Sequence, residues 1–229
     1  MESFALISDV HGNLEALDSV LKVLNNQKIY CLGDVVGYGA NPNEVIERLK
    51  SHGVEAILGN HDYAVVTGET GYFNSAAAIA IRWTINNLTT ENLEYLRRLP
   101  REQTFTTGAG NIYLAHGSPS DNLWEYVDPS THSDLLDYYL RKLSAQMIGL
   151  GHTHVPYVWR GKAGVVANPG SVGQPRSGDN RTSFALVEMN QDKIDVRIQR
   201  VAYDIGAAAR KIEAAGLPRV LSDRLYLGR

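Results

Sequence analysis

Two histidines stand two residues apart in the segment Gly151-His152-Thr153-His154, directly after an apolar run at 147–150. That run is typical of a short buried strand. Side chains at positions i and i+2 of an extended segment point to the same face, so both imidazoles can reach one point or two neighbouring points. This spacing is typical of metal ligands, although a loop with two exposed histidines has the same pattern. The rest of the chain decides between these interpretations.

Polar residues follow four other predicted strands in the same way. The strands are expected at 3–7, 28–32, 54–58 and 111–115, and the residues after them are Asp9, His11, Asp34, Asn60, His61 and His116. Five of the seven histidines therefore lie at strand ends. Strands that alternate with helices predict right-handed crossovers and a largely parallel sheet, whose ligands gather outside the carboxyl ends of the strands. We expect these loops to meet.

The candidate ligands are carboxylate, amide and imidazole groups, without a thiolate. Such a set suits two divalent transition-metal ions, chosen from Mn²⁺, Fe, Zn²⁺ and Co²⁺, better than a structural zinc cage. The set is larger than one ion needs. One shared carboxylate between two ions about 3.5 to 4 Å apart would stabilise the attacking and leaving oxygens of an in-line displacement at phosphorus. The residues therefore predict a hydrolase of phosphate esters.

The composition and net charge indicate the number of domains and the kinds of molecule that the chain could bind. With 229 residues, 44% of them hydrophobic, the chain is expected to form a single domain over 1–229. A formal net charge of -3 argues against nucleic acid as a partner, and the chain carries no polybasic block for a membrane surface. A small phosphorylated substrate, with nucleotides among the candidates, fits better. The single cysteine, Cys31, excludes an intrachain disulfide, and the N-terminus lacks a basic leader, so a cytoplasmic location is expected. The oligomeric state is left open.

The other expected elements follow from periodicity and capping. Asn13 is predicted to cap one helix, and Asn41 with Glu44 is predicted to form a capping box at the start of another. Trp83 falls on the apolar face of a helical stretch, and Thr90 is predicted to cap the helix that follows it. Further helices are expected at 133–143 and 205–215, and hairpins at 157–167 and 184–200, the latter turning at 190–192.

The ordered motifs resemble those of the calcineurin-like metallophosphoesterases. The sequence as a whole is similar to the small bacterial phosphodiesterase-like branch of this family. The motifs are Asp9-Val10-His11, Gly33-Asp34, Gly59-Asn60-His61-Asp62, His116 and Gly151-His152-Thr153-His154. The resemblance implies an α/β fold, a four-layer α/β/β/α sandwich of two mixed β-sheets flanked by helices. The second sheet does not follow from periodicity alone.

The resemblance also implies roles for these residues. It implies that one ion is held by Asp9, His11 and His154, and the other by Asn60, His116 and His152. Asp34 would bridge the ions and His61 would be the general acid. The expected mechanism is in-line attack on phosphorus by a hydroxide held between the ions, with Asn60 stabilising charge on the non-bridging oxygens.

Two positions depart from the pattern of the family. Many members have a carboxylate or amide three residues after the acid of the Gly-Asp motif, where it supports the catalytic histidine; here Gly37 stands there. The Ser/Thr protein phosphatase branch has an arginine at the next position, where this chain has Tyr38. Arg176 could instead reach a substrate phosphate, or form a surface salt bridge. Tyr38, Trp124 and Tyr126 could stack on a nucleobase, or simply pack at the rim of a cleft.

Three functions remain open on this basis. A phosphodiesterase for small or nucleotide-like substrates is favoured. A Ser/Thr protein phosphatase would need a phosphate clamp that the Gly-Asp loop lacks. A non-catalytic metal-binding scaffold would resemble the retromer subunit, but the complete ligand set and His61 count against it.

Overall fold

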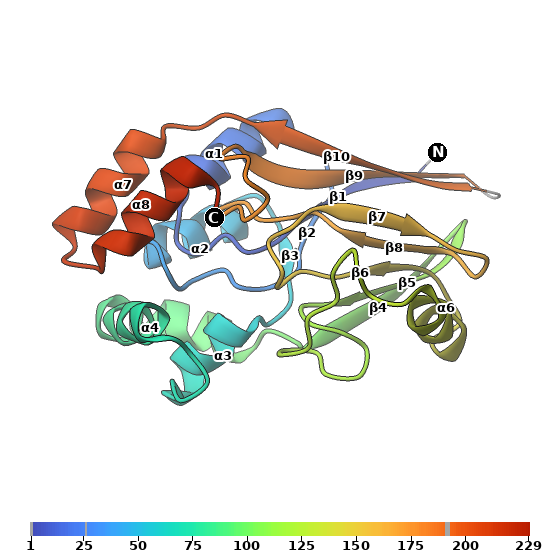
Figure 1. Ribbon diagram of the computed structural model, residues 1–229, viewed down its shortest axis with the longest axis horizontal. Helices are drawn as coiled ribbons and strands as arrows, with labels where there is room; N and C mark the ends of the chain where they lie inside the picture. The colour runs from blue at the N-terminus through green and yellow to red at the C-terminus, as the bar shows by residue number, and fades with distance from the viewer. Residues whose placement is uncertain (1, 26, 191–192) are drawn as a thin grey trace.

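The computed structural model describes residues 2–25, 27–190 and 193–229 and contains two mixed five-stranded sheets that face each other (Figure 1). The first has the order β10-β9-β1-β2-β3 and the second the order β4-β5-β6-β8-β7. Strands β1, β2 and β3 pair in parallel, as do β5, β6 and β8, whereas the remaining pairs are antiparallel. The parallel run of β1, β2 and β3 is the part that the alternation of strands and helices predicts.

The bounds of the strands are β1 Glu2–Ile7, β2 Ile29–Cys31, β3 Glu55–Ala56, β4 Glu102–Thr107, β5 Gly110–Ala115, β6 Ala145–Gly149, β7 Tyr157–Arg160, β8 Val165–Asn168, β9 Thr182–Asn190 and β10 Lys193–Val201. The helices are α1 Leu14–Val23, α2 Pro42–Ser51, α3 Asn60–Thr67, α4 Ser75–Asn87, α5 Thr90–Arg97, α6 Ser133–Lys142, α7 Ile205–Ala214 and α8 Arg219–Leu227. Residues 191 and 192 of the predicted 190–192 turn lie outside the described residues.

Side chains of β1 show why the layers stack. Phe4 and Leu6 point into the apolar cluster between the sheets, whereas Ala5 and Ile7 point into the cluster beneath α1 and α2. The alternation of strand side chains thus buries both faces of the sheet. The second sheet packs its other face on α6, and α7 and α8 pack together at the far end of the molecule from α6 (Figure 1). The result is the four-layer α/β/β/α arrangement.

Some of the predictions about helix caps and packing are confirmed, and others are wrong. The Asn13 side chain accepts a hydrogen bond from the Ala16 N–H and caps α1, as predicted. Asn41 precedes α2 but its side chain makes no capping bond, so the predicted capping box is wrong. Thr89, not Thr90, caps α5. Trp83 is half-buried and packs against the cluster formed by α4, α7 and α8.

Helix α8 was not predicted from the sequence. It begins after Pro218, buries Leu221 and Leu225 against α7, and ends at Gly228 in the left-handed region. These are ordinary start, face and stop signals of a helix, so the sequence does carry the signal for it. In the described part of the chain, no helix is both long and apolar enough to cross a membrane.

Candidate metal centre

The polar residues after five strands converge on one buried site. Asp9 and His11 follow β1, Asp34 follows β2, and His116 follows β5. Three groups have ligand atoms within 4.8 Å of one another: Asp9 with His11 and His154, His11 with Asp34 and His61, and Asp34 with His116 and His152. Each of these residues is at most 5% exposed, and Asn60 is 4% exposed. The structure therefore brings all eight predicted site residues together.

The backbone at this site is held in an unusual conformation. Among the described residues other than glycine, six have a positive φ, and five of these are Asp9, His11, Asp34, His152 and His154. A left-handed backbone costs roughly 1–2 kcal/mol for a residue with a Cβ. Such conformations persist where the surrounding structure imposes them, and they are concentrated at functional sites. Here they turn each side chain from the end of its strand toward the common centre.

Asp34 lies between the two outer ligand groups. Its Oδ2 is 3.6 Å from His11 Nε2 and 3.4 Å from His116 Nε2, while its Oδ1 accepts a 2.8 Å hydrogen bond from the His61 backbone N–H. Burial raises the pKa of Asp34, but its interactions with the neighbouring imidazoles of His116 and His61 outweigh burial and hold this pKa well below its usual range. Gly59 allows this approach, since a Cβ there would lie 2.1 Å from Asp34 Oδ1.

Backbone carbonyls orient three of the histidine rings. Nδ1 lies 3.2 Å from the Val36 oxygen in His11, 2.7 Å from the Leu32 oxygen in His116 and 2.5 Å from the Gln174 oxygen in His154. A carbonyl only accepts, so each ring donates its Nδ1–H and turns the lone pair of Nε2 toward the centre. This outer support is typical of histidines that bind metal ions.

The unsatisfied atoms at the centre fit a cation. His11 Nε2 and His154 Nε2 lie 3.1 Å apart, with both lone pairs directed inward. Both oxygens of Asp9 and Nε2 of His152 are buried without a hydrogen-bond partner within the described chain. Burying a polar group without a partner is costly. Because the donors are oxygens and imidazoles, these residues fit divalent transition-metal ions.

His61 differs from the other histidines of the site. Its Nδ1 has no hydrogen-bond partner among the described residues, and its ring contacts those of His11, Tyr38 and Phe73. Burial lowers the pKa of His61 to about 4, against the opposing effect of Asp34. A Cβ on Gly37 would lie only 2.7 Å from His61 Nδ1. The ring therefore occupies the space that a side chain at position 37 would need.

No separate role was predicted for Asp62, and the structure provides one. Its carboxylate accepts hydrogen bonds from the backbone N–H groups of Val35, Val36 and Gly59, which belong to the loops that carry Asp34 and Asn60. Burial, together with the charge of Asp34, raises the pKa of Asp62 to about 7. Asp62 thus ties two of the converging loops to each other. Its place three residues after the N-cap of α3 was the available signal.

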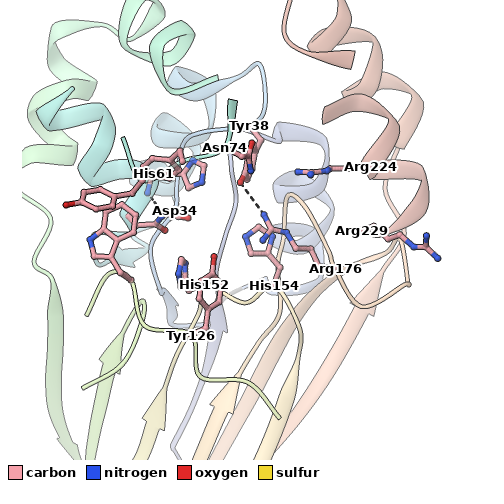
Figure 2. Close-up of a pocket in the computed structure, with 14 residues that line it drawn as sticks. Asp34, Tyr38, His61, Asn74, Tyr126, His152, His154, Arg176, Arg224 and Arg229 are labelled. Atoms are coloured by element: carbon pink, nitrogen blue, oxygen red, sulfur yellow. Dashed lines mark hydrogen bonds between the residues drawn. The ribbon is translucent and has the colours of Figure 1, made fainter. Parts of the chain in front are cut away.

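A pocket of about 360 Å³ opens over the site (Figure 2). One side carries Arg176, whose guanidinium lies over the ring of Tyr38 and donates a 3.2 Å hydrogen bond to its hydroxyl. An arginine therefore does reach Tyr38, but from the loop after β8. Tyr38 itself is buried and packs on His11 and His61, whereas Tyr126 is 59% exposed and stacks on His152.

Comparison with known proteins shows to which family the chain belongs. Residues 3–192 match the model of the calcineurin-like phosphoesterase superfamily domain. The chain is 39% identical, over 245 aligned positions and 98% of both chains, to the uncharacterized protein MJ0912 of Methanocaldococcus jannaschii. A metallophosphoesterase structure from Sphaerobacter thermophilus has a TM-score of 0.83 at 32% identity, covering 100% of this chain and 99% of its own. The hypothetical protein PH1004 of Pyrococcus horikoshii has a TM-score of 0.91 at 25% identity, with the same coverage. Since the family model spans most of the chain and its motifs meet at one buried site, this protein belongs to the calcineurin-like phosphoesterase superfamily.

Proposed function

We propose that this protein is a phosphodiesterase that uses two divalent transition-metal ions to hydrolyse small or nucleotide-like phosphate esters. The observation that carries the proposal is the meeting of the ligand groups around Asp34, whose carboxylate lies within 3.6 Å of a histidine Nε2 on either side. A single group of ligands would bind one ion. Two groups of ligands on either side of the Asp34 carboxylate suit two ions.

The distances among the ligand atoms support the assignment of ligands that the family resemblance implies. Asp9, His11 and His154 would hold one ion, since their ligand atoms lie within 4.8 Å of one another. His116 and His152 would hold the other together with Asn60, whose Oδ1 lies 3.0 Å from His116 Nε2. When bound, the ions lower the pKa of a water molecule and withdraw charge from the phosphoryl oxygens.

Side chains of the protein itself would transfer the proton and bind the oxygens of the substrate. His61 is neutral at pH 7 in the free protein, because burial lowers its pKa to about 4. A phosphate beside the ring adds negative charge and so raises this pKa, which lets His61 pass a proton to the leaving oxygen. Asn60 would donate from its amide to a non-bridging oxygen. Arg176, which lines the same pocket, would contact another oxygen of the substrate.

Hydrolysis of two chromogenic esters tests the proposal. Bis-p-nitrophenyl phosphate and p-nitrophenyl phosphate are compared with the Mn²⁺-loaded protein and with chelator-treated protein. We expect the diester to be hydrolysed faster and the chelator to abolish both activities. Preference for a phosphoserine peptide would indicate a protein phosphatase instead. Metal binding without hydrolysis of any ester would indicate a scaffold. The cytoplasmic location stays a prediction.

A further inference from the structure

The pocket over the metal centre has a basic side, of which the proposed chemistry uses only Arg176. Figure 2 shows Arg176 and Arg224 on the side of His154, with the guanidinium of Arg224 directed toward Tyr38. Arg229 also lines the pocket, farther out. Within the described part of the chain, no carboxylate lies within ion-pair distance of these three arginines. Guanidinium groups without a carboxylate partner attract anions in a concave site. Arg176 already donates from Nε and Nη2 to the Gln174 side chain, so the fork of Arg224 is the one that suits a phosphate.

The arginines are held in place by the fold. Helix α8 ends at Gly228, whose carbonyl accepts a 2.9 Å hydrogen bond from the Gly178 N–H. Asn180 Nδ2 donates to the Tyr226 carbonyl at 3.1 Å. Hydrogen bonds therefore hold the end of α8 against the loop that carries Arg176. Gly228 is needed there, because a Cβ would lie 2.6 Å from the Asp179 carbonyl group.

Charge balance indicates that this side binds more than the scissile phosphate. In the proposed function, Asp9 and Asp34 would neutralise half of the charge of two divalent ions, and a diester phosphate with its attacking hydroxide would neutralise the rest. The positive charges of Arg176 and Arg224 are then left for further anionic groups. Arg176 adjoins His154, and Arg224 lines the same pocket, so those groups would lie next to the scissile phosphate.

Aromatic side chains line the pocket as well. Trp124 is half-buried and contacts the rings of Tyr72 and Phe73, with centroids 5.2 Å and 5.4 Å away. Tyr72 is 80% exposed, and Tyr126 presents a further exposed ring. All four line the same pocket as Arg224. Exposed aromatic faces beside a phosphate site are suited to stacking on a nucleobase.

We infer that the substrates of this site are nucleotides with at least one phosphoryl group beyond the scissile one. Arg176 and Arg224 bind the additional phosphoryl group, and the base stacks on the aromatic wall around Trp124. This inference rests on the proposed function for the place of the scissile phosphate. It adds a binding role for α8, which lies outside the matched residues 3–192.

Calorimetric titration of the Mn²⁺-loaded protein tests the basic side without relying on turnover. The probes are methylphosphonate, which has one phosphonate group, and methylenediphosphonate, which has two and resists hydrolysis. We expect Arg224→Gln to weaken binding of methylenediphosphonate about 10-fold and to leave binding of methylphosphonate unchanged. Arg224→Lys, which keeps the charge and loses the fork, should weaken it about 3-fold.

Arg219→Gln is the matched control, since Arg219 lies on the same helix, is 84% exposed at its side chain and does not line the pocket. Equal affinity of wild type and Arg224→Gln for methylenediphosphonate would overturn the inference, as would an equal loss in Arg219→Gln. Failure of the proposed function appears separately, as wild-type protein that hydrolyses neither chromogenic ester.

Adenosine 5′-(α,β-methylene)diphosphate tests the aromatic wall. Trp124→Leu should weaken its binding about 10-fold while leaving that of methylenediphosphonate unchanged, because only the nucleotide has a base to stack. Equal binding of the nucleotide analogue to wild type and Trp124→Leu would overturn the nucleotide assignment.

Discussion

His61 and Gly37 depend on each other at the level of single residues. Gly37 has a φ of +130°, and a Cβ there would lie 2.7 Å from His61 Nδ1 and 2.9 Å from His11 Nδ1. Gly37→Ala should therefore displace both imidazoles. We expect activity on bis-p-nitrophenyl phosphate to fall about 100-fold, as a misplacement of catalytic groups by about 1 Å can cause.

Gly53→Ala serves as the control for Gly37→Ala. Gly53 also has a positive φ, +62°, but a Cβ there would meet nothing within 4 Å. This variant should lose about 1 kcal/mol of stability and keep its activity. Full activity in Gly37→Ala would contradict the packing of His61 against this glycine.

Substitutions of His61 and Asp34 separate turnover from metal binding. His61→Ala should retain the metal and lower kcat by about 10²- to 10⁴-fold, because the ring is assigned to proton transfer. Asp34→Ala should lose metal as well as activity, because Asp34 lies between both ligand groups. Elemental analysis and rate measurements on both proteins provide the readout. Metal loss in His61→Ala would assign this histidine a ligand role instead.

Helix α1 is the element that joins two parts of the site. Its cap, Asn13, accepts from the Ala16 N–H at 3.1 Å and donates from Nδ2 to the Gly173 carbonyl at 2.9 Å. Asn13→Ala removes the cap and leaves a buried carbonyl without this donor. We expect a loss of about 2 kcal/mol in the free energy of unfolding, measured by urea denaturation.

Asn41 is the matched comparison for Asn13, because it occupies the same position before α2 without a side-chain capping bond. Asn41→Ala should change stability by less than about 0.5 kcal/mol. Equal losses in the two variants would show that the capping bond of Asn13 is not what stabilises this junction.

At the scale of the whole molecule, the sequence predicts the residues at strand ends better than the surroundings of the pocket. The loops after β1, β2 and β3 meet because parallel strands place their carboxyl ends at one edge of a sheet. Arg224 and Tyr72 could not be predicted in the same way. They reach the pocket through the packing of α8 and of the segment before α4, and neither has a local spacing that identifies a ligand.

Part of the pairing in the second sheet also lay beyond the local pattern. In that sheet β8 pairs antiparallel with β7, as the predicted hairpin at 157–167 requires, but it also pairs in parallel with β6, which was not predicted. Periodicity describes which face of a strand is buried and carries no information about its neighbour. The family resemblance supplied that part of the fold. The single domain over 1–229 stays a prediction.

Removal of the metal ions should lower the stability of the whole fold. The buried oxygens of Asp9 and the buried Nε2 of His152 have no hydrogen-bond partner in the described chain, so a bound ion is what would satisfy them. An ion that binds only the folded state at 100 times its Kd stabilises it by about 2.7 kcal/mol. For a protein of this size, each 1 kcal/mol changes Tm by about 2–4 °C. Mn²⁺-loaded protein should therefore melt about 5–10 °C above chelator-treated protein. Asp34→Ala should melt at the same temperature with or without Mn²⁺, since Asp34 faces both ligand groups. An identical Tm for loaded and chelated wild type would mean that these residues do not bind the ion in the folded protein.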